Sequence, residues 1–255
     1  MRIRVLGAYG AEAPGGRHAS AFLLNERILL DAGGVTSALP IAEQMALDDV
    51  LLSHAHLDHV AGLGYLSEAR ALNQLSRPLT LCATAPIVAA MQRSFFNNTL
   101  WPDFSSIPNA QSPIVKFRTL TEQAENDVGG LRVTPVGVSH SVPCSGFIMR
   151  ADGHSVVYSG DTGPTDALWT LARQRGDVTA VILECSFPNR LARLAADAKH
   201  MTPHLVANEI AKLPPGAQVL IFHIKPLFYD ETADELKKIG SERIVLLEQG
   251  NTYDI

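Results

Sequence analysis

The segment His54–His59, which reads HAHLDH, places three histidines and an aspartate within six consecutive positions. It follows the short apolar run Val50–Leu52, which is typical of a buried strand. The glycine-containing apolar segment Val60–Leu66 comes directly after it. The sequence therefore predicts a polar loop between the end of a strand and a following helix, where a rigid scaffold commonly holds functional residues.

Imidazole and carboxylate groups are the usual protein ligands for zinc and related divalent ions. Alternate side chains of an extended segment point the same way, so His54 and His56 can reach one ion together. Asp58 and His59 follow a turn of the chain and can reach a second ion. Because four ligand-type side chains are concentrated in one short segment, the H-x-H-x-D-H spacing favours a metal site over a solvated polar loop.

Three later segments repeat the pattern of an apolar strand that ends in a ligand-type residue. Their final residues are His140, Asp161 and His223. Functional groups of open α/β sheets lie at the carboxyl ends of strands, so we expect these side chains to converge on the first loop. Asp31 ends an earlier hairpin, and we expect its carboxylate to hydrogen-bond to the ligand loop and orient it.

The order of apolar runs and turn residues predicts hairpins followed by helix-linked strands in both halves of the chain. We expect strands over residues 2–8, 20–25, 27–31, 50–52, 78–82, 114–120, 131–138, 146–150, 155–159, 180–183, 218–222 and 243–246. We expect helices over residues 35–45, 62–75, 85–95, 203–213 and 231–238. This order indicates two αβ halves packed sheet to sheet, forming a single domain over residues 1–255.

Composition narrows the classes of function. A hydrophobic content of 46% supports a substantial core, and a net charge of −5 without a lysine or arginine cluster argues against long nucleic acids as partners. No apolar run approaches the roughly 18 residues that a membrane span needs. The segment Met1–Gly7 lacks a signal-peptide core, so a cytoplasmic protein is expected. Three scattered cysteines without a CxxC pair predict neither a disulfide framework nor a thiolate zinc site.

Residues 96–113 form an irregular insertion in which aromatic residues alternate with asparagine, aspartate and proline. One interpretation is a loop that packs its own aromatic side chains against the body of the protein. The other is a lid whose Trp101 and Phe104 present a stacking face to a ring-shaped substrate. The insertion is equally compatible with a contact in a homodimer.

The H-x-H-x-D-H loop and the later ligand-type residues together resemble the metallo-β-lactamase superfamily, over about residues 5–223. The resemblance implies a four-layer αβ/βα sandwich, in which two mixed β-sheets are flanked by helices around a site for two metal ions. It assigns one ion to His54, His56 and His140, the other to Asp58, His59 and His223, and both to Asp161.

A narrower resemblance joins the chain to class II cyclic-nucleotide phosphodiesterases. Segment 54–63, HAHLDHVAGL, looks like that family's signature. Later blocks resemble the family in the same order, namely SGDTGP at 159–164, ECSFPN at 184–189, HMTP at 200–203 and HIKP at 223–226. The implied activity is hydrolysis of 3′,5′-cyclic AMP, with cyclic GMP as a further candidate substrate, to the 5′-monophosphate.

Leaving-group chemistry suggests further roles. His200 is the candidate general acid and Glu184 the carboxylate that orients it, a pair resembling one in the tRNA 3′-processing nucleases. Asp58 is placed to orient the attacking oxygen as well as to bind metal. Lys225 could steady the phosphate, and His18, in a glycine-rich loop, could line the mouth of the pocket.

The cofactor implied is a pair of divalent ions, with zinc expected and manganese or iron compatible with the same ligands. Two cations about 3.5–4 Å apart lower the pKa of a bridging water and hold the charge of a phosphodiester. A different phosphodiesterase, such as a tRNA 3′-processing endonuclease, is the second hypothesis. The third is a non-catalytic nucleotide-binding module, which would bind cyclic nucleotides without forming product.

Overall fold

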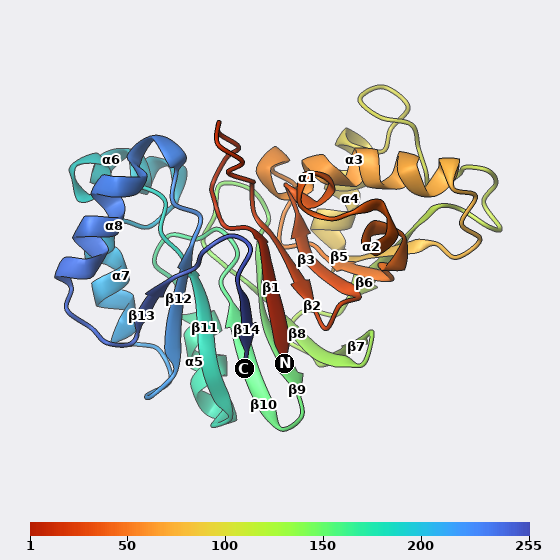
Figure 1. The fold of residues 1–255 in the computed structure, drawn as a ribbon. Coiled ribbons are helices and arrows are strands. Elements are labelled where there is room, and N and C mark those ends of the chain that lie inside the picture. Colours follow the sequence, from red (N-terminus) through yellow and green to blue (C-terminus); the bar gives the residue numbers. More distant parts are fainter.

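The computed structural model describes residues 1–255 and contains two seven-stranded sheets that face each other (Figure 1). In the first sheet the strands lie in the order β14-β1-β2-β3-β4-β5-β6, with β3 to β6 parallel. Their bounds are β1 (Arg2–Gly7), β2 (Ala21–Leu24), β3 (Ile28–Ala32), β4 (Asp49–Leu51), β5 (Leu79–Thr84), β6 (Val115–Leu120) and β14 (Thr252–Asp254). The remaining neighbours pair antiparallel, so the sheet is mixed.

The second sheet has the order β13-β12-β11-β10-β9-β8-β7 and is also mixed. Strands β7 to β10 pair antiparallel, whereas β10 to β13 pair parallel. The bounds are β7 (Asn126–Val128), β8 (Leu131–Gly137), β9 (Ser145–Ala151), β10 (His154–Tyr158), β11 (Val178–Glu184), β12 (Gln218–Phe222) and β13 (Ile244–Leu246).

Helices cover the outer face of each sheet (Figure 1). The first sheet carries α1 (Val35–Ala38), α2 (Ile41–Ala46), α3 (Leu57–Leu72) and α4 (Ala85–Ser94). The second carries α5 (Ala167–Arg175), α6 (Ala192–Ala198), α7 (Pro203–Ile210) and α8 (Tyr229–Lys238), with short 3₁₀ turns at Asn189–Leu191 and Pro226–Phe228. The layer order of helices, sheet, sheet and helices confirms the predicted αβ/βα sandwich.

Alternation along the strands explains the layers, because successive strand side chains point to opposite faces of a sheet. In β2 and β3, Phe22, Leu24 and Leu30 point toward the second sheet and pack in a core shared with Phe147 and Phe222. Leu23 and Leu29 point the other way, into a separate core beneath α1 to α4. A third core lies between the second sheet and its helices. Three apolar layers therefore separate the four structural layers.

The predicted helix over residues 35–45 is wrong in one respect, because it is two short helices separated at Pro40. Leu39 is extended, with ψ of 135°, and proline disfavours a helical conformation in the residue before it. The helix predicted from Gly62 begins five residues earlier, at Leu57. Strands β7 and β14 and helices α5 and α6 were not predicted.

Candidate metal centre

Seven of the ligand-type residues singled out from the sequence meet where the carboxyl ends of strands from both sheets approach each other. His54 and His56 follow β4, and Asp58 and His59 occupy the first turn of α3. The remaining three, His140, Asp161 and His223, come after β8, β10 and β12 of the second sheet. The centre is therefore assembled from loops that both sheets hold in place.

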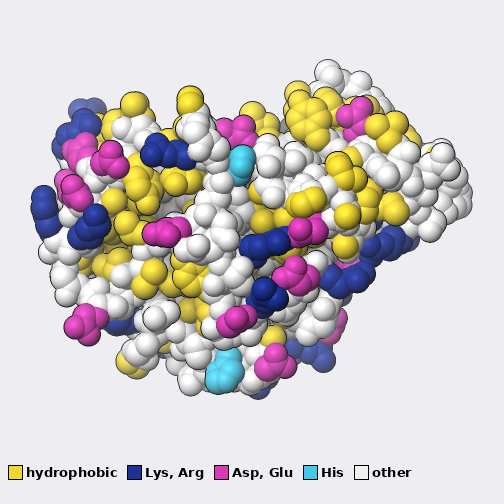
Figure 2. All heavy atoms as spheres, viewed as in Figure 1, with side chains coloured by type: hydrophobic (Ala, Val, Ile, Leu, Met, Phe, Trp, Pro, Cys, Tyr) yellow, Lys and Arg dark blue, Asp and Glu magenta, His cyan; other side chains and the backbone are white.

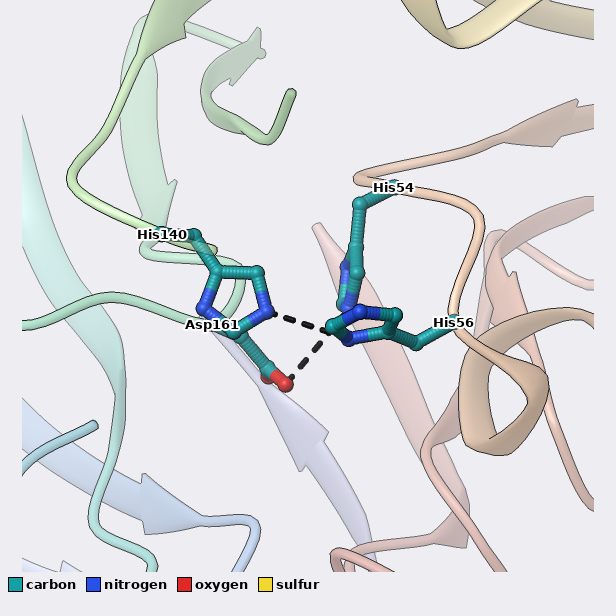
Figure 3. A group of neighbouring side chains, drawn as sticks. All are labelled: His54, His56, His140 and Asp161. Carbon is teal, nitrogen blue, oxygen red and sulfur yellow. Dashed lines mark hydrogen bonds and ion pairs between the residues drawn. The ribbon is translucent and has the colours of Figure 1, made fainter. Parts of the chain in front are cut away.

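One cluster consists of His54, His56, His140 and Asp161, whose ligand atoms all lie within 4.8 Å of one another. Figure 3 shows the four side chains pointing toward a common point, two from each sheet. His140 Nε2 lies 3.1 Å from His56 Nδ1, and His54 Nε2 lies 3.6 Å from Asp161 Oδ2. This arrangement fits three imidazole nitrogens and one carboxylate oxygen around a single ion.

The second cluster consists of Asp58, His59 and His223, again with ligand atoms within 4.8 Å. The Nε2 atoms of His59 and His223 are 3.1 Å apart, and Asp58 Oδ2 lies 3.3 Å from His223 Nε2. Asp161 also contacts this cluster, with Oδ1 3.3 Å from His59 Nε2 and Oδ2 3.2 Å from His223 Nε2. Its carboxylate is thus shared between the two clusters.

Hydrogen bonding within the clusters fits cations better than protein partners alone. His54 Nε2 and Asp161 Oδ1 are buried without a hydrogen-bond partner, although a buried polar atom normally has one. His140 Nδ1 is 3.3 Å from the carbonyl oxygen of Lys199. Because a carbonyl only accepts, Nδ1 carries the hydrogen of the neutral ring and leaves the Nε2 lone pair facing His56. The donor set therefore suits divalent metal ions.

The pKa values of the clustered histidines also fit a metal centre. Burial lowers the pKa of His54 and His56 and lowers that of His140 to about 4, so these rings are neutral near pH 7. Burial alone would also lower the pKa of His59, but the Asp161 and Asp31 carboxylates outweigh it and raise that pKa well above its ordinary value. The first cluster thus offers neutral imidazole ligands, and the carboxylates around His59 favour a positive charge, which a metal ion would supply in place of the proton on that ring.

Asp31 orients His59, as its place before the ligand loop suggested. Its Oδ2 accepts hydrogen bonds from His59 Nδ1 at 2.7 Å, from the Ser53 hydroxyl at 2.6 Å and from the Tyr158 hydroxyl at 2.7 Å. Its Oδ1 accepts from the Ser53 backbone N–H at 2.8 Å. Asp31 has a φ of +54°, a left-handed conformation that is costly for a residue with a side chain. Four hydrogen bonds hold it there, and they turn His59 Nε2 toward the cluster.

Two glycines allow the backbone to approach the ligands closely. A Cβ on Gly33 would lie 2.0 Å from the carbonyl oxygen of Asp58. Only glycine at this position therefore lets the first turn of α3 pack against the end of β3. A Cβ on Gly10 would lie 2.9 Å from ring atoms of His223. Neither position was singled out from the sequence.

Glu184 and His200 form the predicted pair beside the second cluster. Glu184 Oε1 is 2.7 Å from His200 Nδ1, and the carboxylate also accepts from the backbone N–H groups of Thr162 and Met201. Burial opposes a charge on His200, but Glu184 outweighs it and raises the pKa of the imidazole. His200 also has a ligand-type atom within 4.8 Å of Asp161 and His223. A charged imidazole at this position can donate a proton into the centre.

Of the substrate contacts predicted from the sequence, Lys225 lies next to the clusters and His18 lies in another cavity. Lys225 Nζ lies 3.5 Å from Asp58 Oδ2 and borders the second cluster. His18 instead lines a cavity of 320 Å³ that contains none of the clustered residues, because its side chain is directed toward β1 and α1. A place for His18 at the mouth of the site stays a prediction.

The insertion packs its aromatic side chains against the body of the protein, in the core beneath the helices and on α3. Phe104 is buried in the core beneath the helices, 6.3 Å from the Phe96 ring, so the predicted stacking role of Phe104 is wrong. Trp101 donates from Nε1 to the carbonyl oxygen of Gly64 at 3.1 Å. Its ring lines a separate apolar pocket of 290 Å³ with Leu57 and Ala61 of α3, and this pocket includes none of the clustered residues.

Ser186 is the functional residue that sequence reasoning missed. Its hydroxyl lies 3.0 Å from Glu184 Oε2 and 2.9 Å from His223 Nδ1. A carboxylate only accepts, so the hydroxyl donates to Glu184 and accepts from His223 Nδ1–H. That bond leaves the Nε2 lone pair of His223 free to bind metal. Ser186 lies in the ECSFPN block, which was the only signal available for it.

Comparison with known proteins identifies the class. Residues 26–224 match the β-lactamase superfamily domain, and the chain belongs to this family. A probable 3′,5′-cyclic-nucleotide phosphodiesterase of Yersinia pestis is 29% identical over 253 residues, covering 86% of this chain and 68% of the relative. Ribonuclease Z of Archaeoglobus fulgidus is 24% identical and covers 96% of this chain and 95% of the relative. The family and the two clusters together support a hydrolase that uses divalent metal ions.

Solved structures agree on the fold. Unliganded yeast PDE1 superposes with a TM-score of 0.82 at 18% identity, covering 98% of both chains. The metallo-β-lactamase fold protein YhfI of Bacillus subtilis gives a TM-score of 0.79 at 20% identity, covering 99% of this chain and 98% of the other. The predicted superfamily fold is thus confirmed. No helix here is both long and apolar enough to cross a membrane.

Proposed function

We propose that this protein is a metal-dependent phosphodiesterase that hydrolyses 3′,5′-cyclic AMP, and cyclic GMP as a further substrate, to the 5′-monophosphate. The observation that carries the proposal is a pair of His/Asp clusters sharing Asp161, with a Glu184–His200 pair against the second cluster. Relatives named cyclic-nucleotide phosphodiesterase in Yersinia pestis and Aliivibrio fischeri support the same substrate class. We propose zinc for both ions, held by the seven clustered residues within one domain over residues 1–255.

Bound divalent ions would lower the pKa of a water molecule and neutralise the charge of the phosphodiester. The residues of the chain supply the rest. Asp58 orients the attacking oxygen, and Lys225 provides a positive charge at the edge of the centre. As the bond from phosphorus to O3′ breaks, His200 donates a proton to that oxygen, because a sugar alkoxide is a poor leaving group. Glu184 keeps His200 charged and directed at the leaving oxygen.

A ribonuclease Z-like activity is the second candidate. It is favoured by the Archaeoglobus fulgidus relative, which matches nearly the whole of both chains, and by the Glu184–His200 pair. Charge favours the small substrate, since the net charge is −5. Figure 2 shows basic and acidic side chains interspersed on the visible face, without a continuous basic surface for a long nucleic acid.

The test is a turnover screen of zinc-loaded protein against cyclic AMP, cyclic GMP, a nitrophenyl phosphodiester and a precursor tRNA, each with and without chelator. We expect chelator-sensitive release of 5′-AMP from cyclic AMP. Cleavage of the precursor tRNA without turnover of either cyclic nucleotide would favour the second candidate.

The acid role of His200 is tested within the same screen. His200→Ala should lower kcat for cyclic AMP on the order of 10²- to 10⁴-fold, the usual contribution of a general acid. The nitrophenyl diester should lose far less, because its leaving group needs no proton. Equal losses on both substrates would contradict the assignment. His204→Ala, on the exposed side of α7, is the control and should alter neither rate.

A further inference from the structure

An open groove of 650 Å³ lies beside the metal centre, between two segments that are far apart in the chain. Residues 11–14 and Arg17 form one wall, and Phe187 with residues 225–228 forms the other. We call it the aromatic groove. The segments that carry the walls run side by side, since Tyr9 bridges to Ile224 (Figure 1). None of these lining residues except Lys225 was considered from the sequence as a substrate contact.

The aromatic groove adjoins the centre through Lys225 and Phe187, although none of the seven clustered residues lines it. Lys225, on its second wall, has its ammonium group 3.5 Å from Asp58 Oδ2. Phe187 packs edge-to-face against the imidazole of His200, with ring centroids 5.8 Å apart. A ligand with its phosphate at the clusters would reach the groove by passing Lys225 and Phe187, which contact Asp58 and His200.

The far part of the groove is aromatic and apolar. The Phe228 ring is partly exposed, 6.3 Å from the Phe187 ring, and the Arg190 guanidinium lies 5.4 Å from the centre of the Phe228 ring. Leu227 beside it is 84% exposed. The groove thus combines Lys225 next to the centre with the rings of Phe187 and Phe228, while Glu12 and Arg17 lie on the opposite wall. With the metal centre beside it, this surface fits a ligand with an anionic end and a flat ring.

Backbone hydrogen bonds and cation–π contacts hold the segments that carry the two walls. Gly10 N–H donates to the carbonyl oxygen of Ile224, and Lys225 N–H donates to that of Ser186. The Arg17 guanidinium lies 5.6 Å from the ring centres of both Tyr9 and Tyr229. Ordering these walls costs little on binding, because they are already joined to each other.

We infer that the aromatic groove binds the nucleobase of the substrate, with Phe228 as the stacking surface. The inference rests on the proposed function for the placement of the phosphate. It replaces the stacking role first expected of the insertion, whose Trp101 pocket is smaller, at 290 Å³, and carries no charged residue. Because every base has a stacking face, Phe228 governs affinity for the base more than the choice between adenine and guanine.

The test measures binding of two probes to zinc-loaded protein by calorimetry: 5′-AMP, and ribose 5-phosphate, which lacks the base. Stacking is worth about 1–3 kcal/mol per base, so Phe228→Ala should weaken 5′-AMP binding roughly 5- to 150-fold. Ribose 5-phosphate binding should change less than about twofold. Phe228→Tyr should restore affinity for 5′-AMP, because tyrosine keeps the ring.

Tyr65→Ala is the matched control, since Tyr65 is an exposed aromatic residue of the Trp101 pocket. It should leave both affinities unchanged. An equal loss for both probes in Phe228→Ala, no loss for either, or a loss of 5′-AMP binding in Tyr65→Ala would overturn the inference. Phe228-dependent binding of 5′-AMP without turnover of cyclic AMP would uphold the groove and remove the proposed activity, so the two failures are distinguishable.

Discussion

The Ser186 hydroxyl links two parts of the centre that have different tasks. It lies 2.9 Å from Nδ1 of His223, in the second cluster, and 3.0 Å from Oε2 of Glu184, which holds His200. It is fully buried, so no water can replace it without a cavity. One serine therefore sets which nitrogen of His223 faces the cluster and steadies the carboxylate that holds His200, the proposed proton donor.

Ser186→Ala should weaken zinc binding about 10- to 100-fold, because the group that fixes the tautomer of His223 is lost. The measurement is a zinc titration against a competing chelator, with nitrogen NMR of the His223 ring as a direct report of its tautomer. Ser155→Ala is the control, since Ser155 is equally buried and its hydroxyl has no hydrogen-bond partner. Unchanged zinc affinity and an unchanged His223 tautomer in Ser186→Ala would rule out the positioning role.

The contrast between Ser186 and the histidines shows what a sequence can reveal about single residues. The sequence predicted His54, His56 and His59 as metal ligands, because residue types that bind metals are rare and are concentrated in one loop here. Serine, in contrast, is a common residue type. Whether the Ser186 hydroxyl reaches His223 depends on how β11 and β12 pair, and the local sequence does not indicate that pairing. The sequence also left open which cavity His18 lines, because a loop without a regular pattern does not indicate the direction of its side chains.

Helix α3 connects the ligand loop to the first sheet. Its first turn carries Asp58 and His59, where the positive end of the helix dipole favours a carboxylate. Gly33, just beyond β3, packs so closely against the Asp58 carbonyl in this turn that there is no room for a side chain at position 33. The position of two ligands is therefore set by one contact between a glycine and the start of a helix.

Gly33→Ala should displace the start of α3, because the new methyl group would meet the Asp58 carbonyl at 2.0 Å. We expect a loss of about 1–3 kcal/mol in the free energy of unfolding, as for other overpacked sites, together with weaker occupancy by one of two ions. Denaturant unfolding and metal content check the two effects. Gly163→Ala is the control and should change neither, because Gly163 lies two residues after Asp161 but the nearest atoms to the new methyl group are 3.7 Å away.

At the level of elements, periodicity predicted the long strands and most helices but not their ends. The first turn of α3 was read as loop, because its ligand residues break the apolar pattern that marks a helix. Strand β14 was missed because it is three residues long and pairs with β1 at the opposite end of the chain. Such a pairing is fixed by tertiary contacts, not by local preference.

The two sheets are joined at the centre by polar contacts as well as by an apolar core. The Tyr158 hydroxyl, from the second sheet, donates to Asp31 of the first. Each cluster draws ligands from both sheets, since His140, Asp161 and His223 follow strands of the second. Metal ions in these clusters would therefore hold the halves together and stabilise the folded state over the unfolded chain.

Zinc should raise the melting temperature for this reason. At an ion concentration on the order of 100 times Kd, the gain is about 2.7 kcal/mol, or very roughly 5–10 °C for a chain of this size. Calorimetry with and without chelator measures it. His223→Ala should remove the share of the rise that the second cluster contributes, whereas Lys225→Ala should keep the full rise, because an ammonium group cannot bind metal. A zinc-dependent rise of the same size in His223→Ala would argue against the second cluster as a metal site.

The most direct test of the two-ion centre is anomalous X-ray scattering from crystals of the zinc-loaded protein at neutral pH. We expect two ions per chain, one held by His54, His56 and His140 and the other by Asp58, His59 and His223. Asp161 should contact both. A single ion per chain, or an Asp161 carboxylate turned away from both positions, would contradict the proposed chemistry.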